Sequence, residues 1–302
     1  MVNYTIHSAT KNNNKWSFSL LILSFYLHLR FIVLNQNIFR NLCLLFVFSI
    51  PFSSAGSVEL SPNDLKIEFI KTVTSHLALP PEAVTSYANS LNESLQSSGS
   101  LSDGPQYVFL VDRNPNIQLV MIFWGDGKNA WQLIGAAPVS TGLPGTFDHF
   151  LTPLGVFNHS LDNPDFRAEG TKNEFGFKGY GEKGLRVYDF GWVEEARGWG
   201  NGEKRMMRLQ MHSTDPDLAE NLLGIPRSKG CIRIPAAVNT FIDRYGLLDF
   251  DYDAGVEKGL NYWVLRKDRI PTSTPGRYLV VIQSHADTRP IWSPLPRHQK
   301  WY

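Results

Sequence analysis

The chain has 302 residues, which is enough for one large domain with an appendage. Its composition, 43% hydrophobic and 19% charged, is typical of a folded core and excludes a disordered chain. The formal net charge is +1 and no basic cluster stands out, so we expect no nucleic-acid partner.

The first 55 residues predict a signal or targeting segment. No acidic residue precedes Glu59, and the apolar run over residues 42–50 leads into small residues that end at Ala55. This pattern predicts export to the periplasm or cell envelope, with cleavage near Ala55. A membrane anchor is the alternative, because residues 16–34 are also largely apolar, although a histidine and an arginine interrupt them.

The cysteine content points to one reactive thiol. The chain has two cysteines, Cys43 and Cys231. Because Cys43 falls in the segment that we expect to be removed, the mature protein would keep a single thiol and could form no internal disulfide. A lone thiol in an exported protein is a candidate for chemical reactivity.

Residues 56–96 predict a small helical segment. Ser61 is suited to cap a first helix, a proline follows it, and apolar residues recur at helical spacing as far as Leu77. Two consecutive prolines end this pattern, and a second apolar stripe runs over residues 84–95. Residues 97–105 predict a linker, since they are rich in Ser and Gly. The helices are expected to pack on the domain that follows, with recruitment of a partner as the alternative.

After the linker, residues 106–285 predict a mainly β domain, with a peripheral tail over 286–302. Short β-forming runs are separated by turn residues, which is typical of an antiparallel sheet or a barrel-like architecture. The expected strands are 107–112, 117–123, 131–136, 205–212, 262–266 and 278–283. A helix is expected from Pro235 to Tyr245, ended by Gly246, and it would anchor the loop before it.

Residues 163–202 are rich in glycine, charged and aromatic residues. A long irregular segment of this kind predicts a lid or a substrate-binding loop. The alternative is that the aromatic side chains pack the edge of the domain.

The strand expected over residues 205–212 has an informative alternation. Three apolar residues at odd positions alternate with Arg208, Gln210 and His212. The histidine therefore lies on the mainly polar face, where a catalytic base would be needed. Because they share this face, Arg208 and Gln210 are expected to line the same site.

The segment Met211–Pro235 carries the candidate chemistry. A thiol nucleophile needs a base that takes its proton and donors that hold the oxygen on which negative charge develops. His212 precedes Cys231, and Gly230 before the cysteine allows a sharp turn of the backbone. Arg233 could hold a carboxylate through a bidentate contact. A structural histidine with a buried cysteine is the alternative, whereas two such ligands are fewer than zinc commonly takes.

The same segment resembles the signature of the L,D-transpeptidase catalytic-domain family (YkuD-like). That signature has a histidine, a spacer and Ser-His-Gly-Cys, followed by an apolar residue and Asn or Arg; here it runs from His212 through Ser228 to Arg233. Lys229 departs from it, because it stands where the family usually has its second histidine. The resemblance extends from about Gln106 to Gln283. Its upstream segments are Val111–Arg113, Ile117–Phe123, Pro138–Gly142 and Thr152–Phe157.

The resemblance implies a mainly β fold with short helices, in the form of an L,D-transpeptidase-like β-sandwich or barrel-like catalytic domain. It also implies an exported cysteine acyltransferase that cross-links or modifies the cell wall through a thioester, without a cofactor or a metal. The donor would be a peptidoglycan stem peptide, and the amine acceptor another stem peptide, a lipoprotein or an amino acid. By this match Cys231 is the nucleophile and His212 its base, while the carbonyl of Ser213 orients the imidazole.

The other expected site residues surround this pair. Backbone N–H groups of Gly230 and Cys231 would form an oxyanion hole, and Ser228 would shape the loop through a side-chain hydrogen bond. Arg233 would bind a substrate carboxylate, with a surface ion pair as the alternative. Lys229 would assist substrate binding, since its charge favours a thiolate but lysine is a poor base near neutral pH.

Two other functions stay open on the sequence. A carboxypeptidase or amidohydrolase would use the same nucleophile and resolve the thioester with water, so that exclusion of water decides between transfer and hydrolysis. A non-catalytic peptidoglycan-binding domain is the other, because Lys229 departs from the family pattern. Failure of Cys231 to become acylated would favour this last function.

Overall fold

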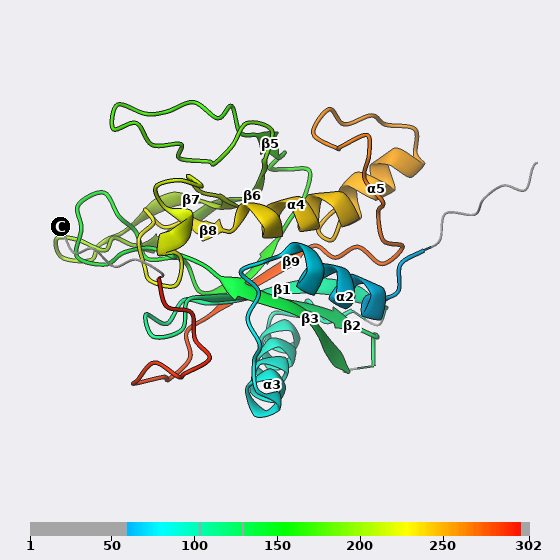
Figure 1. Cartoon of the computed structure of the whole chain (residues 1–302), viewed down its shortest axis with the longest axis horizontal. Helices are drawn as coiled ribbons and strands as arrows, with labels where there is room; N and C mark the ends of the chain where they lie inside the picture. Colours follow the sequence, from blue (N-terminus) through cyan, green and yellow to red (C-terminus); the bar gives the residue numbers. More distant parts are fainter. Residues whose placement is uncertain (1–58, 103, 129, 297–302) are drawn as a thin grey trace, which may run out of the picture. The chain divides into compact units, whose positions relative to one another are not determined.

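Two β-sheets share one hydrophobic core in the part of the chain that the computed structural model describes, residues 59–102, 104–128 and 130–296 (Figure 1). Residues from Glu59 onward form one compact unit. The signal segment expected over residues 1–55 lies outside the described residues. No helix of the described part is long and apolar enough to span a membrane.

The larger sheet has five strands in the order β3-β2-β1-β9-β4. Neighbouring strands are antiparallel except for β1 and β9, which are parallel. The strands are β1 Gln106–Asp112, β2 Leu119–Gly125, β3 Trp131–Pro138, β4 Gly155–Asn158 and β9 Tyr278–Ile282.

The smaller sheet has four strands in the order β5-β6-β7-β8. Its β7 and β8 are parallel and its other pairs antiparallel. The strands are β5 Phe166–Arg167, β6 Arg186–Ala196, β7 Lys204–Ser213 and β8 Ile232–Ile234. Both sheets are open, so within the described residues the mainly β fold is a pair of layered sheets and not a closed barrel.

Strand β1 is buried on both faces, which explains its unbroken apolar sequence. Tyr107, Phe109 and Val111 point into the core between the two sheets. Val108 and Leu110 point to the opposite face, into a second cluster that α3 covers. The alternation of side chains along one strand thus holds two layers together.

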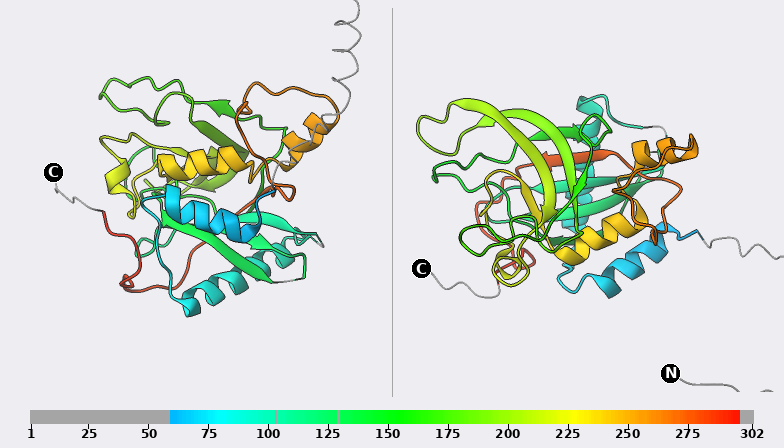
Figure 2. Two further views of the ribbon diagram at one scale, coloured as in Figure 1. Left: turned by 45° about the vertical axis from the view of Figure 1, so that its right-hand side comes forward. Right: turned by 90° about the horizontal axis from the view of Figure 1, so that it is seen from above.

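The helices lie on two sides of the larger sheet (Figures 1 and 2). They are α2 Pro62–Thr72, α3 Pro81–Ser97, α4 Ala236–Tyr245 and α5 Phe250–Glu257, with a 3₁₀ turn at Glu220–Leu222. Helix α2 lies beside α4, where the rings of Phe69 and Phe241 meet edge to face with centroids 5.1 Å apart. Helix α3 covers the other face.

The predicted start of the helical segment is confirmed in detail. Ser61 caps α2 by accepting the Asp64 N–H at 3.2 Å, and the Asp64 carboxylate accepts the Ser61 N–H at 3.0 Å. This reciprocal capping box satisfies two backbone donors at the end of the helix. Leu65, Phe69 and Leu91 of the two apolar stripes are fully buried in the two cores. The expectation that the helices pack on the β domain is therefore correct.

Several expectations drawn from local pattern are wrong. Residues 262–266 form turns and not a strand, and Phe250–Glu257 is a helix that its sequence pattern did not indicate. The segment expected to be irregular over 163–202 contains the eleven-residue strand β6. Two strand pairs are parallel, so neither sheet is purely antiparallel. The described part of the tail is packed and not peripheral, because the ring of Trp292 contacts Tyr87 on α3.

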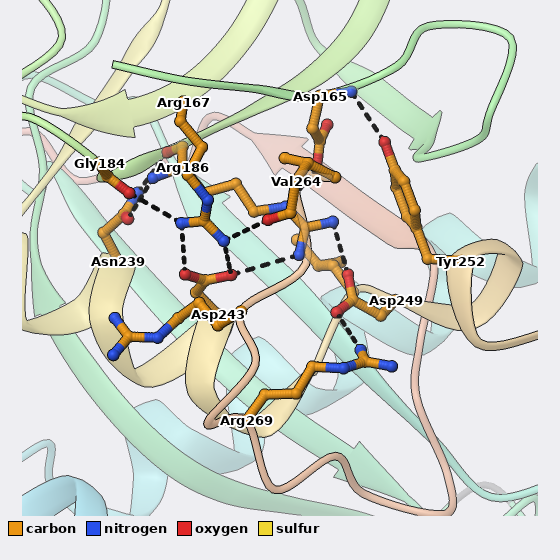
Figure 3. A network of polar contacts seen from close by, with 12 residues as sticks. Asp165, Arg167, Gly184, Arg186, Asn239, Asp243, Asp249, Tyr252, Val264 and Arg269 are labelled. Carbon is orange, nitrogen blue, oxygen red and sulfur yellow. Dashed lines mark hydrogen bonds and ion pairs between the residues drawn. The ribbon is translucent and has the colours of Figure 1, made fainter. Parts of the chain in front are cut away.

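Figure 3 shows a set of charged side chains, mostly buried, that come from β5, β6, α4 and the start of α5. The fully buried Arg186 places its Nε 2.7 Å from Asp165 Oδ2 and its Nη2 2.7 Å from Asp249 Oδ1. Arg167 of β5 donates to Asp243 of α4 at 2.7 Å. Because opposite charges compensate one another here, the desolvation of each is offset by its partners. The set ties the smaller sheet to α4 and α5.

A backbone contact also links the two sheets directly. Ser140 follows β3 of the larger sheet and pairs with Arg233 of β8 in the smaller one. The Ser140 N–H donates to the Arg233 carbonyl at 3.0 Å, and the Arg233 N–H donates to the Ser140 carbonyl at 2.9 Å. Strand β8 is thereby held between β7 and this segment.

Candidate active site

The parallel pair β7 and β8 positions both the histidine and the cysteine. His212 pairs with Arg233 in the register of these strands, and paired residues point to the same side of a sheet. Gln210 and Arg208, two and four residues before His212, share its side of β7. Cys231 lies directly before β8, and its Sγ contacts the backbone of β7 at Arg208. The alternate residues of β7, including Leu209 and Met211, are buried in the core.

The imidazole of His212 is buried and oriented by the backbone. Its Nδ1 lies 2.5 Å from the carbonyl oxygen of Ser213. Since a carbonyl only accepts, Nδ1 carries the proton and Nε2 has the free lone pair. Burial lowers the pKa of His212 to about 4, and the positive charge of Arg233 acts in the same direction. At neutral pH the side chain is thus a neutral base.

Cys231 is partly exposed as a residue, and its thiol lies against β7. Its Sγ is 3.7 Å from the carbonyl oxygen of Arg208. Burial raises the pKa of Cys231, whereas the N–H of Gln210 and the charge of Arg233 favour the thiolate. With a raised thiol pKa and a lowered imidazole pKa, the resting site holds a neutral thiol and a neutral imidazole. Proton transfer would therefore accompany attack on a substrate.

The loop before the cysteine is closed by Ser228. Its Oγ donates to the carbonyl of Cys231 at 2.5 Å and accepts the N–H of Gly230 at 3.0 Å. The loop-shaping interaction expected of Ser228 is present. The Gly230 N–H was expected as an oxyanion donor but is already engaged, because a short loop turns it toward the serine. Gly230 has φ +123°, and a Cβ there would lie 2.9 Å from Cε of Met207, so the position requires glycine.

Arg233 carries a cation that the described residues leave without a carboxylate. Its guanidinium lies over the ring of Phe177, 5.5 Å from the centroid, and forms no ion pair in the described part of the chain. Burial lowers its pKa. Within the described ranges, the surface ion pair considered as an alternative for Arg233 is thus not formed, and the cation is available to an anionic group of a ligand.

Arg208 and Gln210 are joined to each other through a residue that sequence reasoning did not identify. Both donate to Oδ2 of Asp189 on β6, Arg208 through Nε at 2.7 Å and Gln210 through Nε2 at 2.7 Å. The amide oxygen of Gln210 accepts the hydroxyl of Tyr180 at 3.0 Å. The ring of Tyr180 meets the imidazole of His212 edge to face, with centroids 4.7 Å apart.

These missed residues lie in the segment 163–202, whose aromatic richness was the available signal. Tyr180 and Phe177 come from the irregular part before β6, where their rings contact His212 and Arg233. Tyr188 of β6 is fully buried in the core and does not pack the edge of the domain, as the alternative had expected. Asp189 had no distinguishing signal, because its partners come from another strand.

Lys229 lies on the surface of the loop. Its Nζ is 2.6 Å from Oδ2 of Asp148, and both side chains are more than half exposed. The ammonium contacts this carboxylate and not the thiol or the imidazole. The role in substrate binding expected of Lys229 has no support in this arrangement.

No group of three or more His, Cys, Asp and Glu side chains is arranged to hold a metal ion among the residues that the structure describes. The polar groups of the candidate site are an imidazole, two guanidiniums, an amide, a phenol and one carboxylate. Such a set suits proton transfer and the binding of an anionic or amide-containing ligand.

The sequence and the structure were compared with known protein families, curated proteins and solved structures. No family model and no curated protein matches the sequence. Among solved structures the chain is similar to a mutant of the helical cell shape determining protein Pgp2 from Campylobacter jejuni, at 12% identity and a TM-score of 0.29. The match covers 74% of this chain and 55% of that chain, so this chain spans about half the length of that protein. A similarity of this size carries no argument about function.

Proposed function

We propose that the protein is an exported cysteine acyltransferase of the L,D-transpeptidase type that acts on peptidoglycan stem peptides. The observation that carries this proposal is the arrangement at β7 and β8 of the thiol of Cys231, the oriented base His212 and the cation of Arg233, which has no carboxylate partner among the described residues. A nucleophile, its base and an anion site are the minimum for acyl transfer from a peptide that bears a carboxylate.

The reaction runs in two halves. Sγ of Cys231 attacks the carbonyl of the third stem residue while Nε2 of His212 takes the thiol proton. That proton passes to the departing amine, so D-alanine leaves and a thioester remains. An amine acceptor then attacks the thioester, its proton passes to Nε2, and the sulfur regains a proton as the new amide leaves. His212 returns to its neutral form after each half.

The hydrogen bond that already engages the Gly230 N–H limits how this group could hold the oxyanion. The N–H of Gly230 donates to Ser228 Oγ at 3.0 Å. For this group to stabilise the oxyanion, that hydrogen bond must open when substrate binds. Removal of one such donor typically lowers the rate about a hundredfold or more.

The substrate groups are assigned by charge. The guanidinium of Arg233 would hold a stem-peptide carboxylate beside the nucleophile, because it has no carboxylate partner among the described residues. Arg208 has a half-exposed side chain bound to Asp189, so it would offer its remaining N–H groups at the rim of the site. Export itself rests on the sequence of residues 1–55 alone, and intact mass of the protein from the envelope of its native host tests it.

The test of the function is mass spectrometry of the mature protein. Incubation with a tetrapeptide stem should give a covalent adduct with loss of D-alanine, and a carbapenem should give a stable adduct. Cys231→Ala should form neither while keeping the fold, since little volume changes. Absence of both adducts in the wild type would refute the proposal and favour a non-catalytic binding domain.

Added amines separate transfer from hydrolysis. With a stem-peptide amine present, a transferase should give the cross-linked product. A carboxypeptidase would release the free tripeptide acid at the same rate with or without the amine. The product ratio measured by liquid chromatography decides between the two reactions.

A further inference from the structure

A break in the regular pairing of β6 directs one carboxylate toward the candidate site. The register between β6 and β7 shifts between Asp189 and Trp192, which is the signature of a bulge. Hydrogen bonds of the backbone N–H groups of Asp189 and Gly191 hold the bulge in place. The Asp189 N–H donates to Asp165 Oδ1 at 3.0 Å, and the Gly191 N–H donates to Asp189 Oδ1 at 2.9 Å.

The anchor of this bulge is rigid. Asp165 belongs to the buried charged set of Figure 3, where Arg186 binds its other oxygen at 2.7 Å. Its own N–H donates to the hydroxyl of Tyr252 at 2.8 Å. Because Asp165 is bonded through its N–H and both of its carboxylate oxygens, it holds the Asp189 N–H in one position. The backbone of Asp189 is therefore set by groups that lie outside the site.

The second oxygen of Asp189 determines how Gln210 is oriented. Asp189 pairs directly with Gln210 across the strands. Its Oδ2 accepts the Gln210 amide N–H and the Arg208 Nε–H, both at 2.7 Å. A carboxylate accepts but does not donate, so it can bind only the nitrogen of the amide. The Gln210 oxygen must then face away from Asp189, where it accepts the Tyr180 hydroxyl at 3.0 Å.

Tyr180 links the oriented Gln210 amide to His212. Its ring meets the imidazole of His212 edge to face at 4.7 Å between centroids. The loop that holds it is tied down beside the histidine, because the Lys178 N–H donates to Asp215 Oδ2 at 2.8 Å. A Cβ at Gly181, which has φ +82°, would lie 3.0 Å from Cβ of Ser213, so the loop backbone approaches β7 as closely as glycine allows.

We propose that Asp189 is a positioning residue of the site, which orients Gln210 so that Tyr180 is held against His212. No atom of Asp189 needs to touch the substrate. The inference rests on the proposed function only in that an oriented His212 serves the reaction; the arrangement of the four side chains is independent of it.

The chain offers a matched control for a change at Asp189. Glu203, at the other end of the β6–β7 hairpin, also binds two cationic side chains, Arg197 at 3.1 Å and Arg205 at 3.0 Å, but about half of its side chain is exposed. Asp189→Asn and Glu203→Gln each remove one carboxylate charge from one hairpin. An asparagine at 189 can present an N–H to the Gln210 amide and so permit the flipped orientation.

A magnetic resonance measurement tests the position without requiring activity. In the mature protein with labelled histidine, the ring protons of His212 should carry a ring-current shift from Tyr180, identified by its loss in Tyr180→Ala. We expect Asp189→Asn to move these signals most of the way toward those of Tyr180→Ala, and Glu203→Gln to leave them in place. Unmoved His212 signals in a folded Asp189→Asn protein would overturn the inference.

A double-mutant cycle on carbapenem acylation tests the consequence for the reaction. Asp189→Asn and Tyr180→Phe should each slow acylation about tenfold, and the double variant should be slower than either by less than about twofold, because both break one chain of contacts. Multiplied effects of about a hundredfold would show that the residues act separately and would refute the inference. A wild type that is never acylated refutes the proposed function, and the resonance experiment then decides the position of Asp189 alone.

Discussion

The Nδ1–H of His212 donates to the carbonyl of its own neighbour Ser213, with 2.5 Å between nitrogen and oxygen. His212 and Ser213 are the last two residues of β7, so this hydrogen bond forms when the strand forms. It does not depend on a carboxylate from elsewhere in the chain. The orientation of the imidazole is thus a property of the backbone. Its protonation state is set separately, by burial.

The protonation of His212 predicts a contribution to stability that depends on pH. Its pKa is about 4 in the folded protein and about 6.5 in the unfolded chain. Between these values the unfolded chain binds more protons, so the stabilisation is complete above pH 6.5 and is lost as pH falls toward 4. The loss amounts to about 3 kcal/mol.

Urea unfolding of the wild type and of His212→Asn at several pH values between 7 and 4 measures this effect. The difference in free energy of unfolding between them should shrink as pH falls. His159 contributes with the opposite sign, since burial would lower its pKa but the adjacent Asp165 carboxylate raises it overall. That contribution is common to both proteins and cancels in the difference. Parallel curves for the two proteins would contradict the prediction.

Arg233→Ala should weaken the binding of the donor peptide more than the rate of the bound complex. The guanidinium has no carboxylate partner among the described residues, so its removal costs no internal ion pair. Loss of a charge-assisted contact to a substrate carboxylate should raise KM about tenfold to a hundredfold. Arg205→Ala is the control, because that side chain is exposed and binds Glu203. Steady-state kinetics with a stem peptide and with its amidated analogue provide the measurement; equal KM increases for both would exclude a carboxylate contact.

Lys229 should be dispensable. Its ammonium is exposed and paired with the exposed Asp148, and such surface pairs contribute about 0–1 kcal/mol. Lys229→Ala and Lys229→His should keep measurable carbapenem acylation, whereas His212→Ala should lose nearly all of it. Stopped-flow acylation rates of the three variants give the ranking. The reverse order would transfer the base role to residue 229.

Arg186→Met should strongly destabilise the protein. The fully buried guanidinium compensates Asp165 and Asp249, and its removal leaves both carboxylates buried without that partner. Breaking a buried pair in this way typically costs about 3–5 kcal/mol. Arg205→Met, which loses only an exposed pair, should change stability by less than about 0.5 kcal/mol. Urea unfolding midpoints compare the two, and equal midpoints would show that the buried set contributes no more than a surface pair.

The spacing of apolar residues in the sequence predicted those helices and strands that bury a single regular face. Leu65 and Phe69 identified α2, and the alternation around Leu209 identified β7, because periodicity reports directly which face is buried. Strand β6 escaped prediction since a bulge and Gly191 interrupt its alternation. Tyr262 looked like the start of a strand, yet its ring packs on Tyr252 from an irregular segment.

The site was predictable to the extent that its chemistry lies in one segment. His212 and Cys231 were predicted from their residue types together with the resemblance of their segment to a family signature. In the structure His212 lies on β7, and Cys231 lies directly before its partner strand β8. Asp189 and Tyr180 were not found, because their contacts cross from another strand and from a loop. The engagement of Gly230 by Ser228 also depends on the folded loop and has no sequence signal of its own.

The pairing of Ser140 with Arg233 constrains how a peptide can bind. Strand β8 has β7 on one side, and on the other both backbone groups of Arg233 are bonded to Ser140. An extended peptide can add to a sheet only where an edge strand has unpaired N–H and C=O groups. Beside Cys231 both backbone groups of that edge are already bonded at Arg233. On the proposed function, a stem peptide would therefore be held here by side chains that bind its charged groups and not by strand pairing. D-amino acids and branched linkages, which do not fit a regular strand, would then be tolerated at this position.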